Sequence, residues 1–144
     1  MRAASLTWYV QPVDEALTEQ VRSAMPYAAT LGLEMLAASK DEVRAAVDWE
    51  ERLTTAAGIL HGGVLMGLAD TVGAYCAFLN LPEGSTATAT IESKTNFFAA
   101  VRSGVVEARS RPLHRGSRTI VVETDLFDGA GKHVARVTQT QAVL

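Results

Sequence analysis

The longest apolar stretch of the chain runs from His61 to about Asn80, and Asp70 is the one residue in it with a full charge. Apolar side chains point in every direction around a helix of this length, and small residues recur along it. These small residues are Gly67, Ala69, Gly73, Ala74 and Ala77. A helix that is apolar all round has no face suited to water. The pattern therefore predicts one long helix, buried on all sides, around which the rest of the chain is arranged.

The segments on either side of this helix have patterns that predict strands and one shorter helix. In residues 42–49, Val43, Ala45 and Val47 share one face, and mainly charged side chains occupy the other. Apolar residues at helical spacing predict an amphipathic helix over residues 13–25, ended by Pro26. Short connections favour antiparallel pairing of consecutive strands, and residues 128–131 are typical of a hairpin turn. The predicted strands cover residues 31–38, 42–49, 86–98, 105–112, 118–127 and 134–144.

This order of elements predicts the α+β class, with an antiparallel β-sheet wrapped around one long buried helix. Residues 1–144 are expected to form a single domain. Residues 1–30 supply an N-terminal arm, without periodicity to residue 12, and the short helix. Residues 31–144 supply the core of the domain.

Composition and charge narrow the possible partners. The chain is 48% hydrophobic and 20% charged with a net charge of -3, so it lacks the basic excess of a nucleic-acid-binding protein. Asp70 and several glycines favour a buried helix over a membrane span in residues 61–80. The single cysteine, Cys76, forms no intramolecular disulfide, which fits a cytoplasmic location.

Asp70 is the first functional candidate, because an ionised carboxylate in apolar surroundings is costly unless it is paired, hydrogen-bonded or neutralised. His61-Gly62-Gly63 precedes it at the start of the helix. The first N–H groups of a helix have no internal partner and carry the positive end of the macrodipole, and glycine leaves them open to a ligand. Structural roles remain open: the glycines could serve only close packing on the sheet, and hydroxyl groups could hold Asp70 as a structural carboxylate.

His61-Gly62-Gly63, with Asp70 nine positions after the histidine, resembles the corresponding motif of the hotdog-fold acyl-CoA thioesterases. The likeness is greatest to the phenylacetate-pathway (PaaI-like) type. Residues 90–97, 114–119 and 131–136 match further family segments, and the resemblance covers about residues 31–144. It implies the hotdog fold and hydrolysis of a small or aromatic acyl-CoA thioester. It implies no metal and no cofactor beyond the coenzyme A of the substrate.

The residues and the resemblance together suggest roles for five side chains or amides. Asp70 acts as nucleophile or as general base on water, a choice that stays open. The Gly62 N–H holds the carbonyl oxygen as it becomes an oxyanion. Thr90 matches the strand hydroxyl that positions the carboxylate or the water, and His61 orders the entry to the helix with its imidazole near the carbonyl. Thr55 replaces the asparagine that orients the thioester carbonyl in many family members.

Gly62 and Asp70 cannot act on one thioester from the same helix. Eight residues separate them, or roughly 12 Å at ~1.5 Å per residue. Two copies of the helix, antiparallel across a two-fold axis, bring Asp70 of one copy to Gly62 of the other, twice. The chemistry therefore predicts a homodimer with two shared sites, as the resemblance also implies. Dimers of this fold are further expected to pair into tetramers.

Coenzyme A offers phosphates that basic side chains can bind. Arg115, Arg118 and Arg102, together with the Gly63 backbone, are the candidates for this contact. A solvated basic turn explains the same arginines equally well. The acyl group is expected to contact Met66, Tyr75, Phe97, Phe98 or the N-terminal arm, without a choice among them.

Two other functions fit the same residues. A hotdog hydratase or dehydratase would use His61 and Asp70 as a pair on the acyl chain. A non-catalytic acyl-CoA sensor would keep the fold without the chemistry, and Thr55 keeps this alternative open. A thiol nucleophile is less suitable, since fifteen residues separate Cys76 from His61, roughly 22 Å along a helix. No cluster of His, Cys and carboxylate residues has the spacing of a metal site.

Overall fold

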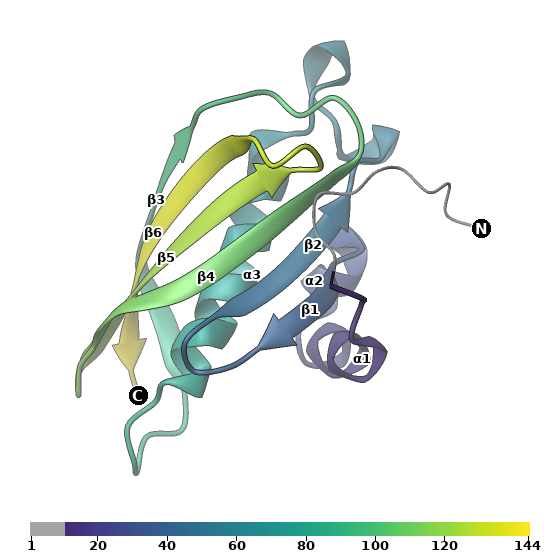
Figure 1. Cartoon of the computed structure of the whole chain (residues 1–144). Helices are drawn as coiled ribbons and strands as arrows, with labels where there is room; N and C mark the ends of the chain where they lie inside the picture. The colour runs from purple at the N-terminus through teal and green to yellow at the C-terminus, as the bar shows by residue number, and fades with distance from the viewer. Residues whose placement is uncertain (1–10) are drawn as a thin grey trace.

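The structure is a computed structural model that describes residues 11–144, so most of the predicted N-terminal arm lies outside the described residues. Two helices and two strands precede one long helix, and four strands follow it (Figure 1). The helices are α1 (Glu15–Ala24), α2 (Pro26–Leu31) and α3 (Gly62–Leu79), with the short 3-10 turns η1 (Glu51–Leu53) and η2 (Ala56–Gly58) before α3. The strands are β1 (Glu34–Ala38), β2 (Val43–Asp48), β3 (Thr88–Phe97), β4 (Val105–Arg115), β5 (Thr119–Asp128) and β6 (His133–Val143).

The strands form one antiparallel sheet in the order β1-β2-β4-β5-β6-β3. The predicted antiparallel sheet with one long helix is confirmed. The expectation that consecutive strands are neighbours is wrong for β3, which pairs with β6 and not with β4. Because β3 ends the sheet, its second edge is left without a strand partner among the described residues.

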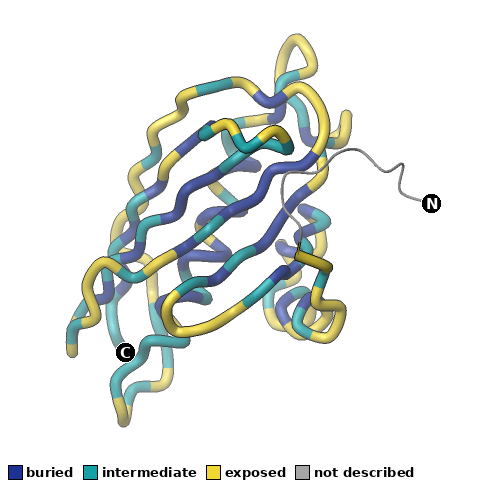
Figure 2. Tube along the Cα trace, in the orientation of Figure 1, coloured by how far each residue is buried: buried dark blue, intermediate teal, exposed yellow. Residues whose placement is uncertain are grey.

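α3 lies along one face of this sheet, and the hydrophobic core fills the space between them (Figure 1). The central strands are buried along much of their length (Figure 2). Alternate residues of β5 and β6 point to α3, as the two-residue period of a strand requires. The buried residues of this layer include Leu65, Leu68 and Val72 of α3, Ile120, Val122 and Leu126 of β5, and Val137 of β6.

α1 lies within the predicted range of residues 13–25 but begins at Glu15 and ends at Ala24, and Pro26 has a different role from the one predicted. Asp14 Oδ1 accepts a hydrogen bond from the Leu17 N–H at 2.9 Å and caps α1. Pro26 then occupies the first turn of a second helix, α2, where its missing N–H is not needed. α2 ends at Gly32, which has the left-handed φ of 68°. The first strand therefore begins at Glu34 and not at residue 31.

One face of α3 is not covered by the other elements of residues 11–144, which corrects the prediction of burial on all sides. Met66, Asp70 and Phe78 are exposed at intervals of four or eight residues, and Ala74 between them is half-buried. The sheet covers the opposite face of the helix. We call these four residues the exposed stripe of α3. By length and hydropathy alone α3 could cross a membrane, but half of it is buried inside the fold, as in a core helix.

Candidate active site

The N-terminus of α3 is capped by His61. The Gly63 N–H donates to His61 Nδ1 at 2.8 Å. The imidazole therefore caps the helix through Nδ1 as the acceptor, which leaves Nε2 as the nitrogen that can donate. The Gly62 N–H donates to no acceptor among the described residues. It is an open donor at the positive end of the helix dipole, as an oxyanion-binding amide requires.

The loop before α3 is held by backbone hydrogen bonds that leave Thr55 outside the contacts of the site. The His61 N–H donates to the Leu53 carbonyl at 2.9 Å, and the Thr55 N–H donates to the Ile59 carbonyl at 2.7 Å. The Thr55 side chain is exposed, and its hydroxyl makes no hydrogen bond within residues 11–144. A catalytic role for Thr55 stays a prediction that no contact supports.

Asp70, on the exposed stripe of α3, accepts hydrogen bonds from two neutral groups. Gln139 Nε2 donates to Asp70 Oδ1 at 2.7 Å. The Thr90 hydroxyl donates to the same oxygen at a longer distance of 3.4 Å. Asp70 Oδ2 accepts no hydrogen bond from the described residues. The carboxylate is therefore oriented through one oxygen, and its other oxygen is open to react.

Gln139 and Gln141 of β6 are functional candidates that the sequence analysis missed. Gln141 Nε2 donates to Thr90 Oγ1 at 2.8 Å, so the four side chains form one chain of hydrogen bonds, from Gln139 through Asp70 and Thr90 to Gln141. Both glutamines are at most 1% exposed. They continue the inward phase of β6, in which Ala135 and Val137 are also buried, and half-buried threonines alternate with them. Two amides in the inward phase of a strand are the signal that could have revealed them.

Gly73 explains how the Gln139 amide reaches Asp70. A Cβ at position 73 would collide with Gln139 Oε1, so the amide lies directly against the helix backbone there. Gln139 Oε1 is itself buried without a hydrogen-bond partner among the described residues. Gly73 is thus needed for a close approach and not for chain flexibility.

β3 runs beside the exposed stripe and contributes to both ends of the candidate site. Its Thr90 meets Asp70, and the ring of its Phe97 lies 3.1 Å from the position that a Cβ on Gly62 would take. Asp70 and Gly62 are eight residues apart on the helix, or roughly 12 Å. The structure thus brings Thr90 to Asp70 but keeps Gly62 away from Asp70 within one chain.

The basic residues predicted to bind coenzyme A do not cluster. Arg102 Nη1 donates to the Ala57 carbonyl at 2.8 Å, near the N-terminus of α3. Arg115 Nη2 lies 2.9 Å from Asp41 Oδ1, in the β1–β2 turn. The Lys40 carbonyl of this turn also accepts from Asn80 at the C-terminal end of α3. Arg102 and Arg115 of one chain therefore lie at opposite ends of α3 and cannot bind the same phosphate group.

The other two predicted coenzyme A contacts receive no support from the geometry. Arg118, at the β4–β5 turn, is exposed, and its contact with coenzyme A stays a prediction. The Gly63 N–H is already bonded to His61, so the amide expected to meet coenzyme A is not free.

Cys76 is a buried core residue and not a nucleophile. Its side chain is fully buried, and its thiol donates weakly to the Ser110 carbonyl at 3.7 Å. Burial raises the pKa of this thiol to about 11, which keeps it protonated near neutral pH. Within residues 11–144, no group of three or more His, Cys, Asp or Glu residues is placed to hold a metal ion.

Comparison with known proteins identifies the family. The family model of the thioesterase superfamily matches residues 57–135. This range includes His61, Gly62, Asp70 and Thr90. The chain belongs to this superfamily. The 1,4-dihydroxy-2-naphthoyl-CoA hydrolase of Escherichia coli is 31% identical over 104 residues, 72% of this chain and 76% of that protein. The predicted resemblance is confirmed, and the chain is a thioester hydrolase.

Solved structures confirm the fold of this thioesterase. A thioesterase of Haemophilus influenzae superimposes with a TM-score of 0.81 at 28% identity, over 97% of this chain and 95% of that chain. The PaaI protein of the Escherichia coli phenylacetic acid degradation operon superimposes with a TM-score of 0.77, over 88% of this chain and 93% of that chain. At 20% identity, PaaI shares the fold. The predicted hotdog architecture is therefore confirmed.

Proposed function

We propose that this thioesterase hydrolyses an acyl-CoA to a free acid and coenzyme A, at a site that two protomers share. The observation that carries the proposal is the state of Asp70, a carboxylate oriented by neutral donors with one oxygen open. The similarity to a hydrolase of a CoA thioester supports coenzyme A as the thiol part of the substrate. No other cofactor is invoked.

In this mechanism the Gly62 N–H of a second copy donates to the thioester carbonyl oxygen and stabilises the negative charge that develops there. Asp70 takes a proton from a water molecule, whose oxygen bonds to the carbonyl carbon. The carbon–sulfur bond then breaks, and the thiolate leaves and is protonated. Alternatively, Asp70 itself bonds to the carbonyl carbon, the carbon–sulfur bond breaks and the thiolate leaves and is protonated. Water then hydrolyses the resulting mixed anhydride, which releases the acid and restores the Asp70 carboxylate. Thr90 donates to Asp70 Oδ1 in either route.

The surface around Asp70 supports the shared site. Met66 and Phe78 of the exposed stripe are 40% and 50% exposed, and Ile91 and Phe97 of β3 are 63% and 52% exposed. These side chains lie next to an open strand edge, a combination typical of protein–protein contacts. Two copies related by a two-fold axis would cover this surface and bring Asp70 to the second copy's Gly62. Tetramers formed from such dimers, and a cytoplasmic location, stay predictions.

Subunit complementation tests the shared site. Asp70→Asn keeps an acceptor for Gln139 but removes the charge, and we expect kcat to fall about 10²–10⁴-fold. Gly62→Pro removes the N–H and adds a ring but keeps the helix start, because proline suits the first position of a helix and His61 has the extended ψ of 134° that a following proline needs. We expect a loss of about 10²–10³-fold. Gly62→Ala is the matched control, since it adds a Cβ at the same place and keeps the N–H.

The two inactive variants are then unfolded, mixed in equal amounts and refolded together. Each mixed dimer contains one site with an intact Asp70 and an intact Gly62 N–H. Random pairing therefore restores about a quarter of the wild-type activity, followed as thiol release from acyl-CoA. A mixture as inactive as its components would show that the site lies within one chain. Full activity of Asp70→Asn would overturn the mechanism itself.

A further inference from the structure

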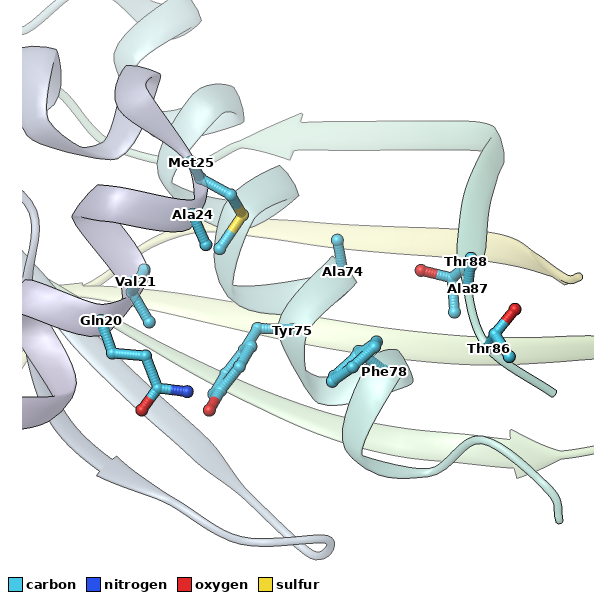
Figure 3. A pocket seen from close by; sticks show the side chains of 10 residues that line it. All are labelled: Gln20, Val21, Ala24, Met25, Ala74, Tyr75, Phe78, Thr86, Ala87 and Thr88. Atoms are coloured by element: carbon cyan, nitrogen blue, oxygen red, sulfur yellow. The ribbon is translucent and has the colours of Figure 1, made fainter. Parts of the chain in front are cut away.

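An apolar cavity of about 490 Å³ lies between α1, the C-terminal half of α3 and the segment that leads into β3. Figure 3 shows side chains from all three elements that converge on it. Of the four side chains predicted to contact the acyl group, Tyr75 lines this cavity, whereas Met66, Phe97 and Phe98 do not. Most of the N-terminal arm, the other predicted contact, lies outside the described residues. The principal lining residues are Val21 and Met25 of α1 and its C-cap, Ala74, Tyr75 and Phe78 of α3, and Thr88 of β3.

The cavity lies next to the Asp70 carboxylate on both α3 and β3. Ala74 lies one helical turn after Asp70, on the same exposed stripe of α3. Thr88 lies two residues before Thr90 on β3 and therefore points to the same side of that strand. α3 and β3 thus form two walls that Asp70 and the cavity share. An acyl carbon chain whose thioester carbonyl is held at Asp70 can extend between these two walls into the cavity.

We propose that this cavity binds the acyl part of the substrate, and that the acyl group is uncharged, apolar and longer than acetyl. The inference rests on the proposed acyl-CoA hydrolysis. α1 then has a specific role, because its C-terminal turn closes the far side of the cavity and limits the length and shape of the acyl group.

The lining determines this class of acyl group. None of the described residues that line the cavity is charged, so an acyl chain that ends in a carboxylate would lose its hydration without gaining a partner among them. The volume lies within the range of about 300–1,000 Å³ typical of small-molecule sites, far more than an acetyl group fills. Met25 adds an adaptable side chain, and Tyr75 and Phe78 offer ring surfaces. Straight-chain and aryl groups share this chemistry.

A panel of four CoA thioesters tests the class with wild-type protein. Hexanoyl-CoA and adipoyl-CoA have the same number of acyl carbons but differ by a terminal carboxylate, whereas acetyl-CoA does not reach the cavity. Phenylacetyl-CoA distinguishes an aryl from a straight-chain group. We expect kcat/KM for hexanoyl-CoA or phenylacetyl-CoA to exceed that for acetyl-CoA by about 10–200-fold or more, since even one methylene in an apolar pocket has that effect. We expect an excess of about the same size over adipoyl-CoA, whose terminal carboxylate would lose its hydration in the cavity.

A pair of matched variants tests whether the acyl group binds in this cavity. Ala24 is an exposed residue at the end of α1 that lines the cavity, and Ala29 is an exposed residue of α2 that does not. Ala24→Phe directs a large ring into the cavity, and Ala29→Phe adds the same ring outside it. We expect Ala24→Phe to lower the hexanoyl-to-acetyl ratio of kcat/KM by about ten-fold or more. Ala29→Phe leaves this ratio unchanged.

The outcomes separate this inference from the proposed function. If the wild-type protein hydrolyses acyl-CoA but the two variants have the same ratio, or adipoyl-CoA is used as well as hexanoyl-CoA, the cavity does not select the acyl group. The proposed function would survive that result. If the wild-type protein releases no thiol from any of the four thioesters, the proposed function and this inference fail together.

Discussion

Asp70 and Asp125 are both carboxylates beside the sheet, but their partners differ. Asp125 is 8% exposed, and both of its oxygens are occupied by cations or potential cations. Arg136 Nε donates to Asp125 Oδ1 at 2.7 Å and Arg136 Nη2 donates to Oδ2 at 3.0 Å, while His133 Nε2 lies 2.7 Å from Oδ1. Asp70 is exposed, has neutral partners at one oxygen and none at the other within the described residues.

The difference separates a structural carboxylate from a reactive one. Burial raises the pKa of Asp125, but the hydrogen bonds and charge of Arg136 and the charge of His133 outweigh it, so the pKa of Asp125 is lower than usual. A carboxylate held by a bidentate arginine keeps little capacity to bond to anything else. A carboxylate held by an amide and a hydroxyl is oriented but keeps its charge for a substrate or water. The partners of each aspartate therefore indicate its role.

The paired substitutions Asp70→Asn and Asp125→Asn would break this comparison most directly. We expect Asp70→Asn to lower kcat about 10²–10⁴-fold while the free energy of unfolding changes little, because the exposed side chain keeps its bond to Gln139. Asp125→Asn should instead lower the free energy of unfolding by about 1–3 kcal/mol through lost charged hydrogen bonds, with kcat nearly unchanged. Thiol release and urea unfolding measure both quantities. A larger kcat loss in Asp125→Asn would reverse the assignment.

A charge introduced at position 139 offers a sharper test of whether Gln139 influences the reactivity of Asp70. Gln139→Glu places a second carboxylate where a donor now lies 2.7 Å from Asp70. Two close negative charges favour protonation of one of them, so the pair of carboxylates would share one proton up to a higher pH. Because Asp70 acts in its ionised form, the acid limb of the kcat–pH profile should move to higher pH by about one unit or more.

Gln139→Met is the control for this substitution, since it removes the donor without adding charge. The acid limb should move less in Gln139→Met than in Gln139→Glu. Identical acid limbs in wild type and both variants, measured over the same pH range, would show that Gln139 does not influence the reactive carboxylate. Such a result would leave Gln139 with a role in packing alone.

Local patterns in the sequence predicted most elements of this fold. The helix over residues 13–25 and the strand alternation around Val43 follow from periods that neighbouring residues create, and the structure confirms them. Pro26 was misinterpreted because proline both ends one helix and begins another, and only the chain after it decides which. The position of β3 beside β6 was missed because pairing between distant strands depends on the assembled sheet and not on loop length.

The candidate site shows the same division between local and distant information. His61, Gly62 and Asp70 were predictable because a helix start and a lone charge in an apolar helix are local features. The contact of Gln139 with Asp70 joins residues 69 positions apart, and no spacing rule connects them. The exposed stripe of α3 was missed because apolar side chains indicate only that a surface avoids water. They do not indicate whether another element of the same chain or a second protein covers that surface.

Two glycines of α3 test whether packing, as well as charge, keeps Gln139 in contact with Asp70. Gly73→Ala should lower the free energy of unfolding by about 1–3 kcal/mol, since the new methyl group collides with the buried Gln139 amide. It should also lower kcat, because Gln139 is displaced from Asp70.

Gly67→Ala is the control in the same helix. Its Cβ meets the ring of Tyr27, which is 54% exposed and free to move. Alanine is also favoured over glycine in a helix by about 1 kcal/mol. Equal effects of the two substitutions on kcat would show that displacing Gln139 is unimportant.

Acid unfolding gives the smallest expected effect. The folded-state pKa of Asp125 is lowered from 3.8, so its contribution to stability is complete above about pH 4. As the pH falls below this value, the unfolded chain binds a proton that folded Asp125 resists, and the contribution is lost. The free energy of unfolding of wild-type protein should therefore fall more steeply than that of Asp125→Asn below about pH 4. Urea titrations at several pH values measure the two slopes. Parallel slopes would mean that Arg136 and His133 do not stabilise the charge of Asp125, and the contrast between the two aspartates would then rest on their exposure alone.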